Sequence, residues 1–402
     1  MQNVRGDSSV GPKTLNPHDS EFARLSPAQR AAMRHVGDEV GRREVGALAR
    51  VNALLQRAGC AADTFSEAVE YVRTHARFVI HFHPDRLSIK SATVAEGLLT
   101  EGVYRNQFET GLSTGLLSPD PGSPRDTWEN RLFGGAYHCE GVTDSERPKY
   151  GVLELVRYSD GPIPRFGSCY FVLRPSVSVR TSFTFAGSED PRATERLGTI
   201  DRMHSVMAAL LSEIEEGGTA SPPWPPFRAP TLGLPNLTVA RLINVLMELR
   251  LPRRDPADGV AGRVLDTQIE AQIHGPIELH RDVDLLVADP AFAATATGTT
   301  LREIAVRYEI PLHWHCGFWL PVRDVPDDFR GPEMPRLAQR IAGLDGTLDA
   351  AVIGSAEASL HQQPDGWRDW GSHKEALQHL KQLWHVLVHH GLPARVRTTP
   401  SS

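Results

Sequence analysis

Arg77-Phe78-Val79-Ile80-His81-Phe82-His83-Pro84-Asp85-Arg86 is the stretch around which the rest of the chain is organised. Its apolar half predicts a buried strand, which the proline ends. Two histidines, an aspartate and an arginine gather where this strand stops. Ionisable groups at the edge of a core are a common way to present chemistry, so we expect a functional site here.

The composition is that of an ordinary globular protein. With 402 residues, of which 40% are hydrophobic and 23% charged, the chain is long enough for two domains or one elaborated domain. A net charge of −6 gives no electrostatic reason to expect stable nucleic-acid binding. The four cysteines stand far apart, which indicates neither a disulfide framework nor a zinc ribbon and favours a reducing cytoplasm.

The sequence shows no membrane or secretion signal. No apolar run approaches the roughly 20 residues of a membrane helix, and the N-terminus lacks the basic-then-apolar pattern of a Sec-type signal. We therefore expect a cytoplasmic protein without a membrane partner. Export as a toxin or effector by another route would leave no such mark.

The pattern of elements predicts an α+β fold, with a central mixed or antiparallel sheet, an N-terminal helical region and a C-terminal helical element. We expect four segments: a disordered lead over 1–23, helices over 24–76, an α+β core over 77–325 and a helical element over 326–402. The Pro-rich piece near 217–236 is interpreted as an insertion in the core.

Local signals place the individual elements. Ser26 and Gln29 form a capping box that opens a long helix, and Thr64 to Glu67 predict a second helix start. Helical spacing predicts helices over 91–99, 197–216, 301–308 and 373–390, and alternation predicts strands over 150–156, 169–173, 178–185, 264–273 and 277–287. Residues 103–115 are expected to form a strand that runs into a loop. Loop and short strand material is expected between 116 and 137.

One interpretation of the opening stretch is a metal site. An H-x-H pair on a strand places two imidazoles on one face, which suits zinc or another divalent ion. The ligands of a metal-dependent hydrolase would then be His81, His83, Asp85 and His274. Seventeen histidines make chance pairs easy, so a structural role for these histidines is the alternative.

A second interpretation joins Arg86 to a distant carboxylate. Transfer from NAD requires a grip on the dinucleotide, by an arginine or a histidine such as His81, and a carboxylate that stabilises the positive charge left on the ribose when nicotinamide departs. The candidate is Glu270, which alternation places on one strand face with Gln268 and Gln272. A solvated edge strand would show the same polar face.

The chain resembles an uncharacterised bacterial family catalogued as a domain of unknown function. The motifs that carry this resemblance are His81-Phe82-His83-Pro84-Asp85-Arg86, Arg147-Pro148-Lys149-Tyr150-Gly151, Arg165-Phe166-Gly167-Ser168-Cys169-Tyr170-Phe171 and Glu270-Ala271-Gln272-Ile273-His274-Gly275. No established activity comes with it.

More distantly, the chain is similar to mono-ADP-ribosyltransferase toxin domains. These enzymes pass from a strand bearing Arg or His, through a Ser/Thr-rich strand, to a strand with Gln/Glu-x-Glu. Arg86 or His81, then Ser182-Phe183-Thr184, then Gln268-Ile269-Glu270 match in that order. The Ser-Thr-Ser form is absent, a long segment separates the last two elements, and Gln107-Phe108-Glu109 is a rival.

The resemblance implies an enzyme that transfers ADP-ribose from NAD, its substrate, to a macromolecular acceptor such as a protein. Glu270, Arg86 and His81 would be catalytic. The residues that would bind the dinucleotide are Arg86, Ser182, Thr184, Tyr104, Tyr137 and Arg165. A metal-dependent hydrolase and a non-catalytic binding or scaffold domain are the alternatives.

Overall fold

A computed structural model describes residues 17–88, 92–112, 120–217, 230–254 and 269–393. Its centre is an eight-stranded sheet in the order β10-β9-β4-β1-β3-β7-β5-β6. Along the sheet these strands are β10 (Leu312–Trp314), β9 (Val283–Ala288), β4 (Cys169–Leu173), β1 (Arg77–Phe82), β3 (Lys149–Glu154), β7 (Ile269–Ile273), β5 (Thr181–Phe185) and β6 (Leu197–Thr199). The mixed α+β class expected from the sequence is confirmed.

The opening stretch does form a central strand. β1 pairs antiparallel with β4 on one side and with β3 on the other, and only β10 and β9 pair in parallel among the described strands. Two small ribbons lie outside the sheet, β2 (Val103–Tyr104) with β8 (Ile277–Glu278) and β11 (Trp319–Pro321) with β12 (Thr347–Asp349).

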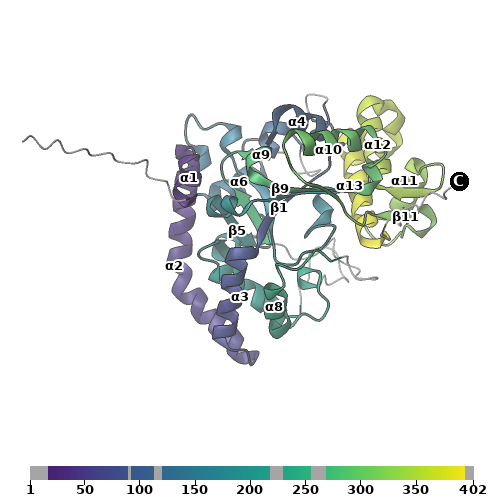
Figure 1. The fold of residues 1–402 in the computed structure, drawn as a ribbon. Helices are drawn as coiled ribbons and strands as arrows, with labels where there is room; N and C mark the ends of the chain where they lie inside the picture. Colours follow the sequence, from purple (N-terminus) through teal and green to yellow (C-terminus); the bar gives the residue numbers. More distant parts are fainter. Residues whose placement is uncertain (1–16, 89–91, 113–119, 218–229, 255–268, 394–402) are drawn as a thin grey trace, which may run out of the picture.

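Helices surround this sheet (Figure 1). They are α1 (Pro17–Ala23), α2 (Pro27–Arg57), α3 (Ala62–His75), α4 (Val94–Glu101), α5 (Gln107–Thr110), α6 (Pro124–Leu132), α7 (His204–Glu215), α8 (Val239–Met247), α9 (Leu279–Asp282), α10 (Ala296–Arg307), α11 (Met334–Ile341), α12 (Ala350–Gln362) and α13 (His373–His390). The N-terminal helices, in purple, and the C-terminal helices, in yellow, lie at opposite ends of the sheet in Figure 1.

The two faces of the sheet differ in chemistry. Because side chains alternate along a strand, Phe78, Ile80 and Phe82 of β1 face one side, where they join the main hydrophobic cluster. Val79 faces the other side and belongs to a small cluster with Tyr170, Val172 and Val287. On the strands that follow β1 toward β6, this second face carries polar side chains. The candidate site lies on this polar part of the sheet.

Several expected helices form as the sequence indicates. Ser26 caps α2, and the Gln29 side chain accepts the return bond of the capping box. Gly102 ends α4 in the left-handed conformation. The closing helix α13 spans the expected 373–390.

Other elements differ from expectation. Residues 17–23, expected in a disordered lead, form α1, and α3 begins at Ala62 rather than at the Thr64 signal. Residues 103–115 were expected to form a strand that runs into a loop, but their described part is two residues of β2 followed by α5, because Asn106 caps a helical turn there. Loop was expected between 116 and 137, but α6 begins at Pro124, where Ser123 caps it.

Two long predicted elements are divided. The predicted helix 197–216 is strand β6 followed by α7, and the predicted strand 277–287 is interrupted by the helical turn α9 between β8 and β9. Of the predicted strand 264–273, β7 forms the part from Ile269. The rest of it, with Gln268, and most of the Pro-rich piece lie outside the described residues.

α1 is fastened to the sheet by a buried network of ion pairs. Glu21 pairs with Arg180 (2.9 Å), and Arg24 pairs with Asp282 (2.9 Å), which itself lies 3.2 Å from Arg180. Arg180 and Asp282 are fully buried. Buried charges require partners, so α1 is part of the folded unit.

The C-terminal helices pack against the end of β1. The Trp384 indole on α13 donates a hydrogen bond to the carbonyl of Pro164 (3.1 Å), and His83 meets the Trp384 ring edge-on at 5.0 Å. α13 therefore covers the region into which the opening stretch leads.

Within the described ranges, no helix is both long and apolar enough to span a membrane.

Candidate active site

The polar face of the sheet gathers side chains from three neighbouring strands. In the strand register, Gln272 of β7 lies between Tyr150 of β3 and Ser182 of β5, and Glu270 lies opposite Thr184. Alternation directs these side chains to the face opposite the main core. The register therefore brings the Ser/Thr strand and the glutamate strand side by side despite their separation in sequence.

A chain of hydrogen bonds runs across this face to Glu270. The buried Tyr137 hydroxyl donates to Nδ1 of His274 (2.5 Å), so the ring proton lies on Nε2, which donates to Ser182 Oγ (3.2 Å). Ser182 donates to Gln272 Oε1 (3.0 Å), and Gln272 Nε2 donates to Glu270 Oε1 (3.2 Å). Gln272 Nε2 also donates to the backbone carbonyl of Glu270 (3.3 Å), and the Glu270 carboxylate is the end point of the side-chain hydrogen bonds.

His274 is neutral in this arrangement. Burial lowers its pKa to about 3, and the charges of Arg180 and Lys149 act in the same direction. The donors and acceptors in the hydrogen-bond chain from Tyr137 to Glu270 therefore stay the same across the physiological range of pH.

Glu270 is partly buried and its charge is only partly compensated. Its Oε1 also accepts a bond from the backbone N–H of Ser188 (3.1 Å). Burial and then the Glu189 charge raise the pKa of Glu270 to about 7, whereas Ser188, Arg125 and Gln272 oppose this rise. A carboxyl group with a pKa near neutrality is typical of catalytic acids and bases.

Arg125 lies close enough to Glu270 for its charge to act on that carboxyl group. The residue is 7% exposed, and its guanidinium sits over the Tyr150 ring at 5.3 Å. In the part of the chain that the structure describes, no carboxylate pairs with it, and its buried Nε has no acceptor. A buried cation without a counter-ion is costly, which indicates that an anionic ligand completes this site.

α6, which carries Arg125, is held in place by Arg147. Its guanidinium pairs with Asp126 (2.7 Å) and Glu129 (2.9 Å), and the Tyr150 hydroxyl donates to Glu129 (2.8 Å). Burial raises the pKa of Glu129 to about 7 despite these partners. Because Arg147 is already engaged by α6, we assign it a structural role.

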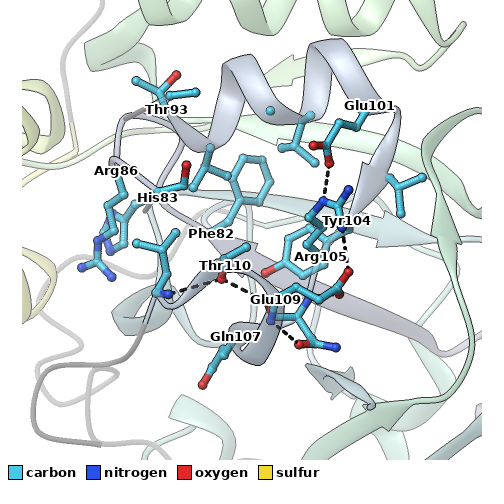
Figure 2. A pocket seen from close by; sticks show the side chains of 18 of the residues that line it. Phe82, His83, Arg86, Thr93, Glu101, Tyr104, Arg105, Gln107, Glu109 and Thr110 are labelled. Atoms are coloured by element: carbon cyan, nitrogen blue, oxygen red, sulfur yellow. Dashed lines mark hydrogen bonds and ion pairs between the residues drawn. The ribbon is translucent and has the colours of Figure 1, made fainter. Parts of the chain in front are cut away.

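A cavity of about 220 Å³ lies beyond the end of β1, beside the polar face. Phe82, Tyr104 and Phe166 supply aromatic lining, and Tyr150 contributes to the wall. Figure 2 shows His83 and Arg86 together on one side of this cavity and Arg105 on the other, where Arg105 is paired with Glu101 and Glu109. Burial raises the pKa of Tyr104 to about 12.

The residues predicted from the sequence divide between these two places. His81, Ser182, Thr184, Tyr137 and Glu270 belong to the polar face, whereas Arg86 and Tyr104 line the cavity, which His81 also borders. Arg86 pairs with Glu357 of α12 (3.4 Å) and makes no described contact with Glu270.

Three of the predicted residues have local structural partners. His81 bonds to the carbonyl of Gly167 through Nδ1 (3.0 Å), and Thr184 donates to the carbonyl of Ala193 (2.9 Å). The Arg165 guanidinium stacks on the Phe166 ring at 4.7 Å.

The residues of the metal alternative do not converge. Among the described residues, no three His, Cys, Asp or Glu side chains are grouped so that they could hold a metal ion. His274 is occupied by Tyr137 and Ser182. Burial and then the Glu357 charge raise the pKa of Asp85 to about 7.

Sequence reasoning missed Arg125. The capping serine and the proline at 123–124 are a helix start signal, which would have found α6. No sequence signal shows that α6 lies over the polar face, because this depends on contacts between distant segments.

Comparison with known proteins gives a family and no activity. The sequence model of a family described as proteins of unknown function (DUF3626) matches residues 77–390. No curated protein is similar to the chain.

Proposed function

The chain belongs to the DUF3626 family, and we propose that it is an enzyme that transfers ADP-ribose from NAD to a macromolecule, with Glu270 as its catalytic carboxylate. The observation that carries the proposal is the position of Glu270, at the end of a hydrogen-bond chain and within electrostatic reach of a buried arginine, Arg125, for which the described residues supply no carboxylate partner.

This arrangement suits the chemistry of the transfer. Nicotinamide leaves with the electron pair of its bond to the ribose C1′, and positive charge develops on the ribose. A fixed carboxylate stabilises that charge most when water is excluded. The acceptor nucleophile then donates its electron pair to C1′ and loses its proton to solvent.

The sheet register adds support. The Ser182 strand and the Glu270 strand, which match the second and third elements of the resemblance to ADP-ribosyltransferases, are hydrogen-bonded neighbours. His81 lies on the same face, two strands from β7. The guanidinium whose charge acts on the glutamate belongs to Arg125 instead of Arg86. The macromolecular acceptor and a role as toxin or effector rest on the resemblance alone.

The test is incubation of the purified protein with NAD and cell lysate. With NAD labelled in the adenylate phosphate, we expect label to enter a macromolecule and nicotinamide to be released in equal amount. NAD labelled in the nicotinamide ring is the control and should transfer nothing. Absence of both transfer and nicotinamide release would contradict the proposed function.

The pH dependence gives a second prediction. The ionised form of Glu270 is the active one, so the rate should rise with pH and reach half its maximum near pH 7. Because the exposed Glu189 carboxylate raises the pKa of Glu270, the Glu189→Gln variant should shift this rise to lower pH and keep the maximal rate. A pH–rate profile of both proteins measures the shift, and superimposable profiles would contradict it.

A further inference from the structure

The cavity beyond the end of β1 has flat aromatic walls. Its volume of about 220 Å³ exceeds the roughly 150 Å³ that suffice for benzene in a protein interior, so it can hold one or two fused rings. Phe82 and Tyr104 meet edge to face with 6.4 Å between ring centroids, and Phe166 belongs to the same wall. Figure 2 shows Phe82 and Tyr104 between helix α4 and Gln107. These walls suit a planar ligand.

The charged side chains of the cavity wall are already paired. Arg105 pairs with Glu101 and with Glu109 (2.9 Å), and both glutamates line the cavity with it. Arg86, the other cation of the wall, pairs with Glu357 of α12 (3.4 Å). An ionic ligand would lose its hydration here without gaining a counter-ion from the described wall, which favours an uncharged ligand.

One neutral polar atom of the wall lacks a partner. The Oε1 atom of Gln107 is buried and accepts no hydrogen bond from the described residues. A buried acceptor without a donor is unfavourable, and such atoms are expected where a ligand or a bound water completes the structure. A ligand that donates a hydrogen bond would satisfy this amide oxygen.

A glycine on α4 leaves space at the cavity. Val94, Gly97, Leu98 and Glu101 all line it, which is the spacing of one helix face. A Cβ atom added at Gly97 would meet no described group outside its own helix backbone within 4 Å. Glycine within a helix is less stable than alanine, and neither a tight contact nor a positive φ requires it at Gly97. The space in front of Gly97 is therefore open to a ligand.

We propose that this cavity binds an uncharged planar heterocycle that carries a hydrogen-bond donor, such as an adenine or a nicotinamide ring. The ring lies against Phe82 and Tyr104, its amino group donates to Oε1 of Gln107, and its edge occupies the space in front of Gly97. Both rings carry an NH₂ group, so they share the recognised chemistry. The inference does not rest on the proposed function, because Glu270 does not line the cavity.

The test is titration of the full-length protein with adenosine and with nicotinamide, followed by NMR of the ligand, which identifies the preferred ring. We expect Gly97→Leu to weaken the binding of that ligand about tenfold or more, because leucine fills the space that the ring requires. Gly37→Leu on α2 is the matched control, since a Cβ atom there also meets no group within 4 Å and Gly37 does not line the cavity.

The hydrogen bond is tested from both sides. Gln107→Met keeps the length of the side chain and removes the oxygen, so it should weaken binding about three- to tenfold, as for the loss of one neutral hydrogen bond. Inosine lacks the amino group of adenosine, and nicotinate has a carboxylate in place of the amide of nicotinamide. The analogue of the preferred ligand should bind more weakly than its parent.

Folding is checked by thermal melting without ligand. Leucine has a higher helix propensity than glycine, so the Tm of Gly97→Leu should be unchanged or higher, and weaker binding cannot then be attributed to unfolding. Should Gly97→Leu not fold, Gly97→Met replaces it in the titration, with the same expected direction.

The outcomes separate this inference from the proposed function. Binding that is weakened by Gly97→Leu and retained in Gly37→Leu and Glu270→Gln supports the cavity as the site, even if the wild-type protein consumes no NAD, a result that would overturn only the proposed function. Absence of binding by both ligands, equal affinity in wild-type and Gly97→Leu proteins, or an analogue that binds as tightly as its parent would overturn the inference.

Discussion

Glu270→Gln is expected to lower the rate of ADP-ribose transfer by about 100-fold or more, the usual effect of removing one electrostatic contact to a transition state. Glutamine keeps an oxygen that accepts the bonds from Ser188 and Gln272, so the loss is that of the negative charge. The measurement is the rate of nicotinamide release at pH 8, where the wild-type carboxylate is ionised.

The same substitution should not weaken the fold. A raised pKa means that folding favours the protonated carboxyl group, so the wild-type protein loses stability as the pH rises from the unfolded pKa through about 7. Glutamine removes this loss, which we expect to amount to about 3 kcal/mol at pH 8 and to vanish at pH 4. Glu303→Gln, an exposed change on α10, is the control. Transfer that persists in Glu270→Gln would disprove the catalytic assignment.

Arg180→Met is expected to destabilise the protein by about 3–5 kcal/mol. Arg180 is fully buried, pairs with Glu21 and Asp282, and donates a hydrogen bond to the carbonyl of His274 (2.5 Å). Methionine fills a similar volume but leaves two buried carboxylates short of a partner. Chemical denaturation measures the difference in the free energy of unfolding.

Arg281→Met is the matched control for this loss. Arg281 pairs with the same Glu21 at 3.0 Å, but its side chain is 44% exposed. Exposed ion pairs contribute about 0–1 kcal/mol, so this variant should melt close to the wild-type protein. Equal destabilisation by both substitutions would show that burial does not determine the strength of the network.

The parts of the fold that local chemistry decides could be predicted from the sequence. The apolar run of β1, the capping box of Ser26 and the stripe of α13 each have a near-neighbour cause. Boundaries failed where tertiary contacts override local pattern, as at α9, which interrupts an otherwise strand-like run. The order of strands in the sheet also lay beyond the sequence, because it depends on pairing between distant segments.

The candidate site could be predicted only in part, for the same reason. Alternation alone put Glu270 and Gln272 on one face, and the structure agrees. The partner of Arg86 was expected to be Glu270, but it is Glu357, which belongs to a helix far along the chain. Arg125 carries no distinguishing mark in the sequence, and its interest comes from its burial and from the lack of a carboxylate partner for it within the described ranges.

The ion-pair network of α1 matters for the choice of fragment boundaries in this protein. The family match begins at Arg77, whereas Glu21 and Arg24, which neutralise Arg180 and Asp282, precede it. A fragment of residues 77–390 would retain the buried Arg180–Asp282 pair and would lose Glu21 and Arg24, which pair with it. We expect such a fragment to be less stable than the full chain, because each of these buried charges loses one of its partners.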